Sequence, residues 1–266
     1  MNERISIVGS GWLAKPLAAA LKQKGYEVRC SNRSGNKPEN FPVDTIKLVI
    51  DEHHVECSDP TFFDAEFLII AIPPGRKSDP EFRHPKEISQ LLKLVKSSKI
   101  IFVSSTSVYP DTNGSVDELC DLTPDTSSGK ALKHAEQLLR DVCGDRLTVV
   151  RFSGLIGGDR MPGRFLAGKS DVENPDAPVN LIHQTDCVRV LMEIIRQNAF
   201  GYTFNACADE HPTRRKYYTE EAEKLGLKVP EFSSQSNGTF KIVDASFLKS
   251  KLGFEFQYPD PQKIDE

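Results

Sequence analysis

The chain has 266 residues, of which 38% are apolar and 27% charged, an ordinary globular composition that excludes a disordered chain. Its formal net charge of −4, from 34 basic and 38 acidic residues, argues against a nucleic-acid or anionic-membrane partner. The longest apolar run, residues 67–72, is far shorter than the roughly 20 residues of a membrane-spanning helix, and residues 1–12 lack the features of a secretion signal, so we expect a cytoplasmic protein.

Short apolar runs alternate with amphipathic patterns through the first part of the chain. Strands are predicted at runs rich in β-branched and aliphatic residues: 5–8, 26–30, 46–50, 67–72, 100–103 and 147–151. Helices are predicted where apolar residues recur at helical spacing: 13–24, 85–96 and 130–143. Pro85 is expected in the first turn of the second helix. This alternation predicts an α/β fold with a doubly wound parallel sheet of the Rossmann type.

The second part of the chain is less regular. Residues 154–178 are rich in Gly and Pro and are predicted as a loop with at most short helices. Beyond it we expect helices at 185–197, 213–225 and 245–252, strands at 202–205 and 240–243, and a frayed tail after Tyr258. The predicted domains are a Rossmann dinucleotide-binding core over 1–158 and a mixed region over 159–266. Within the mixed region, residues from about 179 to 207 are expected to complete the sheet, and the remaining residues to form a small C-terminal substrate-binding lobe.

The segment Gly9-Ser10-Gly11-Trp12-Leu13-Ala14 directly follows the first predicted strand and opens a helix. In this G-x-G-x-x-A pattern the first glycine allows a tight turn, the second lets a diphosphate approach the backbone, and Ala14 is small enough for close packing. Amides at the helix N-terminus attract the phosphates. Dinucleotide contacts are therefore predicted for Gly9, Gly11, Trp12 and Leu13; the alternative is a glycine-rich turn without a ligand.

The end of the second predicted strand indicates which dinucleotide binds. An acidic residue there would bind a ribose 2′-hydroxyl, but this chain has Asn32-Arg33-Ser34, with Lys37 nearby. Arg33 can pair with a 2′-phosphate or stack on adenine, which favours NADP over NAD and makes flavin or S-adenosylmethionine unlikely ligands. The alternative is that Arg33 and Lys37 are solvated loop charges.

Further coenzyme contacts are predicted where other strands end. Asp51 is placed to accept from the adenine amino group, or else to cap a turn. Ala71 and Pro73 allow the chain to pass close beside a ribose, or form a rigid turn. The hydroxyls of Ser104 and Ser105 lie at the carboxyl end of a parallel strand, where open α/β sheets bind ligands; the alternative is that they cap the next turn.

Five segments together carry a resemblance to a known family: residues 9–14, 104–109, 129–139, 151–158 and 180–186. With these segments the chain resembles the extended and atypical branches of the short-chain dehydrogenase/reductase superfamily, the NAD(P)-dependent nucleotide-sugar epimerase/dehydratase type. The resemblance implies that Ser105 contacts the reacting substrate group, that residues 153–156 pass the nicotinamide carboxamide, and that residues 160–183 line the substrate pocket. It also implies a homodimer formed through two helices beside the sheet, for which the residues themselves give no evidence.

The chain departs from this family at the Tyr-x-x-x-Lys pair that moves the proton. None of the six tyrosines is followed four residues later by Lys, and the alignment puts Ser128 and Leu132 at the two positions. A serine hydroxyl is a far weaker acid than a phenol and cannot simply replace it. Tyr109 and Lys130 are the alternative proton-handling candidates, with Lys133 and His183 as further ones. Each also has a structural interpretation, as a packed ring, a solvated helix charge or a hydrogen-bonded imidazole.

Candidate substrate residues follow the last strand of the predicted core. Arg160 and Arg164 lie in a glycine-broken loop and can bind an anionic group, unless they are solvated charges; Asn180 and His183 belong to the segment implied by the resemblance. The six cysteines show no CxxC spacing, so no metal site is expected. The sequence thus predicts an oxidoreductase or epimerase/dehydratase-type enzyme acting on a small polar or anionic substrate. The alternative is a non-catalytic NADP(H)-binding redox sensor or scaffold protein.

Overall fold

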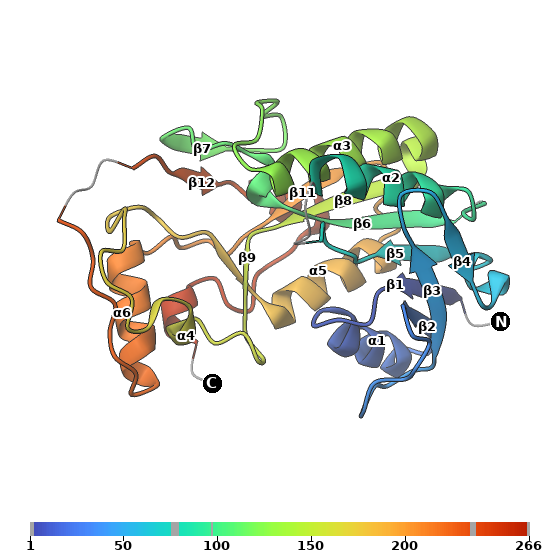
Figure 1. Cartoon of the computed structure of the whole chain (residues 1–266), viewed down its shortest axis with the longest axis horizontal. Helices are drawn as coiled ribbons and strands as arrows, with labels where there is room; N and C mark the ends of the chain where they lie inside the picture. The colour runs from blue at the N-terminus through green and yellow to red at the C-terminus, as the bar shows by residue number, and fades with distance from the viewer. Residues whose placement is uncertain (1–2, 76–79, 97, 235–237, 265–266) are drawn as a thin grey trace. The chain divides into compact units, whose positions relative to one another are not determined.

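The computed structural model describes residues 3–75, 80–96, 98–234 and 238–264 (Figure 1). The chain forms two compact units. Unit 1 contains residues 1–108, 123–151 and 188–204, and unit 2 contains residues 109–122, 152–187 and 205–266. The chain therefore passes between the units several times.

An eight-stranded sheet is the frame of unit 1. Its strand order is β11-β8-β6-β5-β1-β2-β3-β4. The strands are β1 (Arg4–Val8), β2 (Glu27–Asn32), β3 (Thr45–Ile50), β4 (Val55–Cys57), β5 (Phe67–Ile70), β6 (Lys99–Ser105), β8 (Leu147–Phe152) and β11 (Thr203–Ala206). β1 pairs in parallel with both β2 and β5, while β4 pairs antiparallel with β3. The predicted α/β fold with a mostly parallel sheet is confirmed, although the short strand β4 was not predicted.

Helices cover both faces of this sheet. Figure 1 shows α2 (Pro80–Leu92) and α3 (Ser127–Cys143) on one face and α1 (Ala14–Gln23) with α5 (Gln184–Arg196) on the other. All four residues of β5 are buried, as expected for an apolar strand covered on both faces. Three short 3₁₀ helices also occur in the residues of unit 1: Pro60–Phe63, Thr106–Val108 and Gly144–Arg146.

The predicted start of α2 was wrong. The helix begins at Pro80, so Pro85 lies inside it rather than in its first turn. A proline at the first position of a helix costs no hydrogen bond, whereas Pro85 leaves the carbonyl of Glu81 without its helical donor. Since Pro85 looks like a start signal in the sequence, the pattern does not indicate the turn that precedes it.

Unit 2 is built from smaller elements. Two parallel pairs of strands form it: β9 (Gly154–Ile156) with β10 (Leu181–His183), and β7 (Gly114–Val116) with β12 (Lys241–Val243). Its helices are α4 (Gly163–Leu166), α6 (Arg214–Lys224) and α7 (Ser246–Leu252), with a 3₁₀ helix at Pro261–Lys263. Thr213 caps α6 by accepting from the Lys216 amide at 3.4 Å. Gly253, with φ of 60°, ends α7.

The prediction of a frayed tail after Tyr258 was wrong for residues 259–264, while residues 265–266 lie outside the described residues. The fully buried carboxylate of Asp186 accepts from the amides of Gln257 (2.8 Å) and Tyr258 (2.9 Å). Asp260 then caps the last 3₁₀ helix by accepting from the Gln262 amide at 3.0 Å. A buried carboxylate needs donors, and these tail amides supply them, so the tail is held in place.

Among the described residues, no helix is both long enough and apolar enough to cross a membrane.

Candidate functional site

The glycine turn between β1 and α1 is shaped as the motif predicts. Gly9 has φ of 116°, and a Cβ there would lie 3.0 Å from the Ala71 carbonyl oxygen, so the turn passes close to the end of β5. At Gly11, by contrast, a Cβ would meet nothing within 4 Å. The backbone at Gly11 is therefore open to an approaching group. Leu13 and Ala14 are buried and anchor the start of α1, whereas Trp12 is half-buried.

A cavity lies beside this turn within unit 1, with about 700 Å³ of space that is partly open to solvent. We call it the β2–β3 cavity; its lining residues are Val8, Gly9, Ser31, Asn32, Arg33, Leu48, Ile50, Ile72, Pro73, Gly75, Arg83 and Glu87. Four residues that the sequence assigned to the coenzyme thus line one cavity: Gly9, Asn32, Arg33 and Pro73. Ala71 lies directly after β5, where its amide donates to the Val8 carbonyl at 3.0 Å.

The loop after β2 presents an available cation at this cavity. The Asn32 side chain closes the loop, because its Oδ1 accepts from the Gly35 amide at 2.6 Å and its Nδ2 donates to the Asn36 carbonyl at 2.8 Å. The Ser34 hydroxyl donates to the same Oδ1 at 3.2 Å. Arg33 is exposed and has no hydrogen-bond or ion-pair partner in the part of the chain that the structure describes. Its guanidinium is therefore free to bind an anion.

Asp51 occupies the turn of the β3–β4 hairpin. Its carboxylate accepts from the amides of His53 and His54, both at 2.8 Å, and these hydrogen bonds lower the pKa of Asp51. The residue does not line the β2–β3 cavity. The structure therefore places Asp51 in the turn-capping role that the sequence allowed as the alternative to an adenine contact.

The hydroxyls at the end of β6 differ in their roles. Ser104 is buried and its hydroxyl donates to Glu136 at 2.6 Å. Glu136 in turn forms a buried ion pair with Arg151, in which Nη2 and Oε2 are 2.6 Å apart. The Ser104 hydroxyl thus belongs to a structural network. Half-buried Ser105 accepts from the Ser107 amide at 3.1 Å, which leaves its own proton available to a ligand.

The proton-handling positions on α3 are also defined by the structure. Ser128 is exposed and Leu132 is buried, so neither offers an acid comparable to the family's tyrosine and lysine. Lys130 is half-exposed and lies 3.9 Å from the carboxylate of Glu81 on α2. Lys130 thus has an anionic partner within its own unit, and its catalytic role stays a prediction.

Tyr109, in unit 2, is only 2% exposed, and its hydroxyl donates to Asn205 Oδ1 at 2.8 Å. Asn205 is itself held, because its Nδ2 donates to the Asp244 carbonyl at 3.0 Å. The structure thus provides the packed position that the sequence allowed as the alternative for Tyr109.

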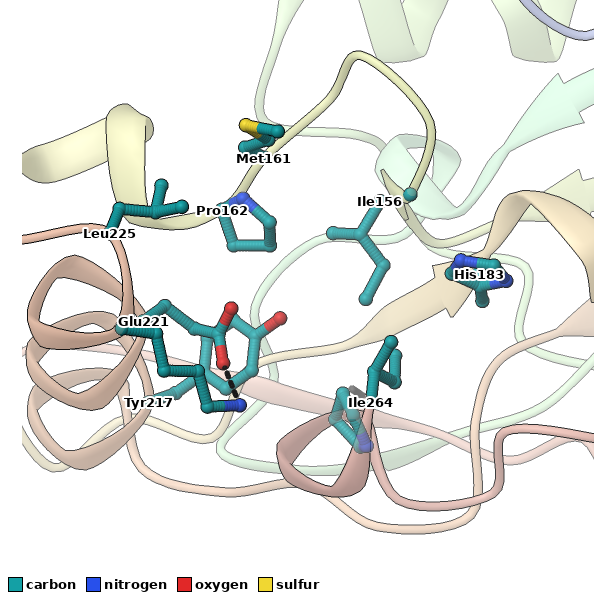
Figure 2. Close-up of a pocket in the computed structure, with 11 residues that line it drawn as sticks. Ile156, Met161, Pro162, His183, Tyr217, Glu221, Leu225 and Ile264 are labelled. Atoms are coloured by element: carbon teal, nitrogen blue, oxygen red, sulfur yellow. Dashed lines mark hydrogen bonds and ion pairs between the residues drawn. The ribbon is translucent and has the colours of Figure 1, made fainter. Parts of the chain in front are cut away.

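A second cavity lies within unit 2, with about 580 Å³ of space that is partly open to solvent. We call it the β9–α6 cavity; its lining residues are Ile156, Gly157, Met161, Pro162, His183, Tyr217, Glu221, Lys224, Leu225, Pro261 and Ile264. Figure 2 shows Ile156 projecting into it between His183 on one side and Tyr217 with Glu221 on the other. Glu221 and Lys224 form an ion pair at 2.7 Å, which neutralises the charge on the α6 side.

His183 is held firmly at the edge of the β9–α6 cavity. Its Nδ1 accepts from the Thr185 amide at 3.2 Å, which places the proton of the neutral ring on Nε2. The ring packs against Tyr258 with centroids 4.2 Å apart. Gly157 passes so close that any Cβ there would overlap the imidazole. Of the four predicted substrate residues, His183 alone lines this cavity.

The other predicted substrate residues lie elsewhere in unit 2. The Asn180 side chain binds the backbone of β12. Its Nδ2 donates to the Lys241 carbonyl at 2.9 Å, and its Oδ1 accepts from the Val243 amide at 2.8 Å. Arg160 pairs through its backbone with Gly157. Arg164 on α4 is exposed, with no side-chain partner within the described ranges, so it can still bind an anion.

Sequence reasoning missed the cavity residues contributed by distant segments. In unit 1 these are Arg83 and Glu87; in unit 2 they are Tyr217, Glu221, Lys224, Leu225, Pro261 and Ile264. The spacing of Tyr217, Glu221 and Lys224 puts them on one face of α6, which was the available signal. A search of the described residues finds no cluster of three or more side chains suited to a metal ion.

Comparison with known proteins agrees with this fold. No family model matches the sequence. The chain is 35% identical over 268 residues to Protein YeeZ of Escherichia coli (strain K12), with 97% of each chain covered. A solved structure of a functionally unknown conserved protein from Silicibacter pomeroyi DSS has a TM-score of 0.77 at 23% identity, covering 97% of this chain and 95% of the other. UDP-glucuronic acid 4-epimerase from Bacillus cereus, solved in complex with NAD, also has a TM-score of 0.77, at 17% identity, covering 96% and 94%. At such identities the two structures support the fold alone.

Proposed function

This chain belongs to the family of Protein YeeZ and has the fold of the short-chain dehydrogenase/reductase superfamily, and on that basis we propose that it binds NADP(H) as an oxidoreductase or epimerase/dehydratase-type enzyme. The observation that carries the proposal is the open backbone at Gly11, next to a cavity that presents Arg33. A bound coenzyme supplies hydride transfer. The chain would hold its diphosphate at residues 9–14 and its adenosine in the β2–β3 cavity. The Bacillus cereus epimerase was solved in complex with NAD, so NAD is the alternative coenzyme.

The substrate part of the proposal is stated for each unit by itself. In unit 2, the β9–α6 cavity would bind a small polar or anionic ligand, with His183 in its wall. Arg164 supplies a free cation in the same unit. Ser105, whose hydroxyl proton is uncommitted, would donate to the reacting oxygen.

Coenzyme choice is tested by calorimetry with NADP+ and NAD+. We expect Arg33→Met to weaken NADP+ binding about 10- to 100-fold, because it removes a charge-assisted contact to the 2′-phosphate, and to change NAD+ binding less than about threefold. Lys37→Met is the matched control, since Lys37 lies in the same loop but pairs with Asp44 at 3.5 Å. Absence of heat with either coenzyme would contradict the proposal, and equal losses for both would contradict the role of Arg33.

A non-catalytic coenzyme-binding sensor or scaffold remains the second candidate function, because Ser128 and Leu132 stand at the positions of the proton-handling pair. The two functions differ in NADPH consumption across a panel of carbonyl substrates that includes nucleotide sugars. For an enzyme, we expect turnover that Ser105→Ala lowers about tenfold or more, since a hydrogen bond to the developing oxyanion is lost. If no substrate is turned over while NADP(H) still binds and changes the affinity for a protein partner, the sensor function is favoured.

A further inference from the structure

The polar groups of the β2–β3 cavity come from two different places. Asn32 ends β2 and Arg33 follows it, at the place where Rossmann folds bind the adenosine ribose and its 2′-phosphate. Arg83 and Glu87 come from α2 and line the same cavity, together with Leu48 and Ile50 of β3 and the loop after β5. The α2 pair is therefore not needed for the ribose and is available to another part of the coenzyme.

The α2 pair, Arg83 and Glu87, is mostly buried and its two members contact each other, so they are not two independent surface charges. The side chains of Arg83 and Glu87 are only 20% and 10% exposed, and Arg83 Nε lies 3.3 Å from Glu87 Oε1. The second oxygen of Glu87 lies 3.7 Å from Nδ1 of the buried His84. The Arg83 guanidinium lies against Gly75 so closely that a Cβ there would overlap it. The pair is thus fixed in position, and within the described residues the terminal nitrogens of Arg83 have no hydrogen-bond acceptor.

We propose that Glu87 and Arg83 together recognise the adenine base, which deepens the coenzyme part of the proposed function and rests on it. The edge of adenine carries an amino donor beside a ring-nitrogen acceptor. A carboxylate beside a guanidinium offers the reverse pattern, an acceptor beside donors, so the two edges are complementary. Val8, Leu48, Ile50 and Ile72 provide apolar walls for the ring. Asp51 does not line this cavity, and its Oδ1 accepts from two backbone amides in the hairpin turn.

The test uses coenzymes in which adenine is replaced by hypoxanthine. Hypoxanthine has an acceptor where adenine has its amino donor and a donor at the adjacent ring nitrogen, so it meets the Glu87–Arg83 pair with both polarities reversed. We expect the unaltered full chain to bind NADP+ at least about tenfold more tightly than nicotinamide hypoxanthine dinucleotide phosphate in calorimetry, and likewise NAD+ over its hypoxanthine analogue if NAD+ binds. Glu87→Gln and Arg83→Met should each reduce this ratio to below about threefold. Lys86→Gln, on the same helix and paired with Glu52 at 3.3 Å, should leave the ratio unchanged.

Several outcomes would overturn the adenine contact. One is that the unaltered chain binds NADP+ and its hypoxanthine analogue with nearly equal affinity, a result that does not depend on the folding of any variant. Another is that both variants keep the preference for adenine over hypoxanthine while far-ultraviolet circular dichroism shows that they are folded. If Arg83→Met weakens NADP+ but neither NAD+ nor the adenine preference, the guanidinium binds the 2′-phosphate instead. If neither NADP+ nor NAD+ gives heat with the unaltered chain, the proposed function itself fails, and this inference fails with it.

Discussion

Glu136→Gln should lower the free energy of unfolding by about 3–5 kcal/mol, because it removes the carboxylate charge that faces the buried Arg151 guanidinium. The two side chains are 3% and 10% exposed, and Arg151 binds the carboxylate through both Nε (3.1 Å) and Nη2 (2.6 Å). The Ser104 hydroxyl also donates to Glu136, so the substitution disturbs that bond as well. Urea unfolding followed by circular dichroism measures the change.

A double variant separates the loss of the charge pair from general damage to the core. Glu136→Leu combined with Arg151→Met removes both charges, and we expect it to be more stable than Glu136→Gln, since paired buried charges are often replaceable by apolar groups. The matched surface control is Glu193→Gln, whose partner Arg196 has a 68% exposed side chain. It should change stability by less than about 1 kcal/mol. A loss below about 1 kcal/mol for Glu136→Gln would contradict the prediction.

Gly11→Ala should leave stability within about 0.5 kcal/mol of the unaltered chain and still weaken NADP+ binding about 10- to 100-fold. The folded protein has room for the methyl group, since a Cβ at Gly11 meets nothing within 4 Å. That room is where the coenzyme diphosphate would approach the backbone amides, and a methyl group there lengthens those charge-assisted hydrogen bonds. Thermal unfolding and calorimetry on the same preparation measure the two effects.

Two other glycines provide the contrast for Gly11→Ala. Gly9→Ala should cost about 1–3 kcal/mol of stability, because φ is 116° and the Cβ would lie 3.0 Å from the Ala71 carbonyl oxygen. Gly25→Ala, at φ of 88° after α1, should cost about 1 kcal/mol and leave coenzyme binding unchanged. Tight NADP+ binding by a folded Gly11→Ala protein would mean that the diphosphate does not rest on this turn.

The parts of the site that the sequence predicts well are those set by short-range patterns. The turn at Gly9 needs a residue that tolerates a positive φ, and it needs a strand before it. The glycine and the apolar pattern of the strand both lie within the first ten residues of the sequence. Arg33 follows a strand end that the apolar pattern locates. The parallel sheet follows from the alternation of strands and helices, which is also a local signal.

What the sequence did not predict depends on longer-range packing. Arg83 lies outside the predicted helix, which starts at Pro85, so the sequence does not indicate the Arg83–Glu87 pair one helical turn apart. The sequence leaves Asp51 open between an adenine contact and a turn cap, because the three-residue strand β4, which creates the hairpin turn, gives too short a pattern to detect. The ordered tail depends on Asp186, which is 71 residues from Gln257 in the sequence. No local propensity encodes such a contact.

The attachment of the tail has a consequence for the wall of the β9–α6 cavity. Pro261 and Ile264 form part of this wall, whereas Asp186 holds the backbone amides of Gln257 and Tyr258. These two hydrogen bonds do not involve the side chains at positions 261 and 264. Exchanges at the two positions would therefore reshape the cavity wall without removing either hydrogen bond to Asp186.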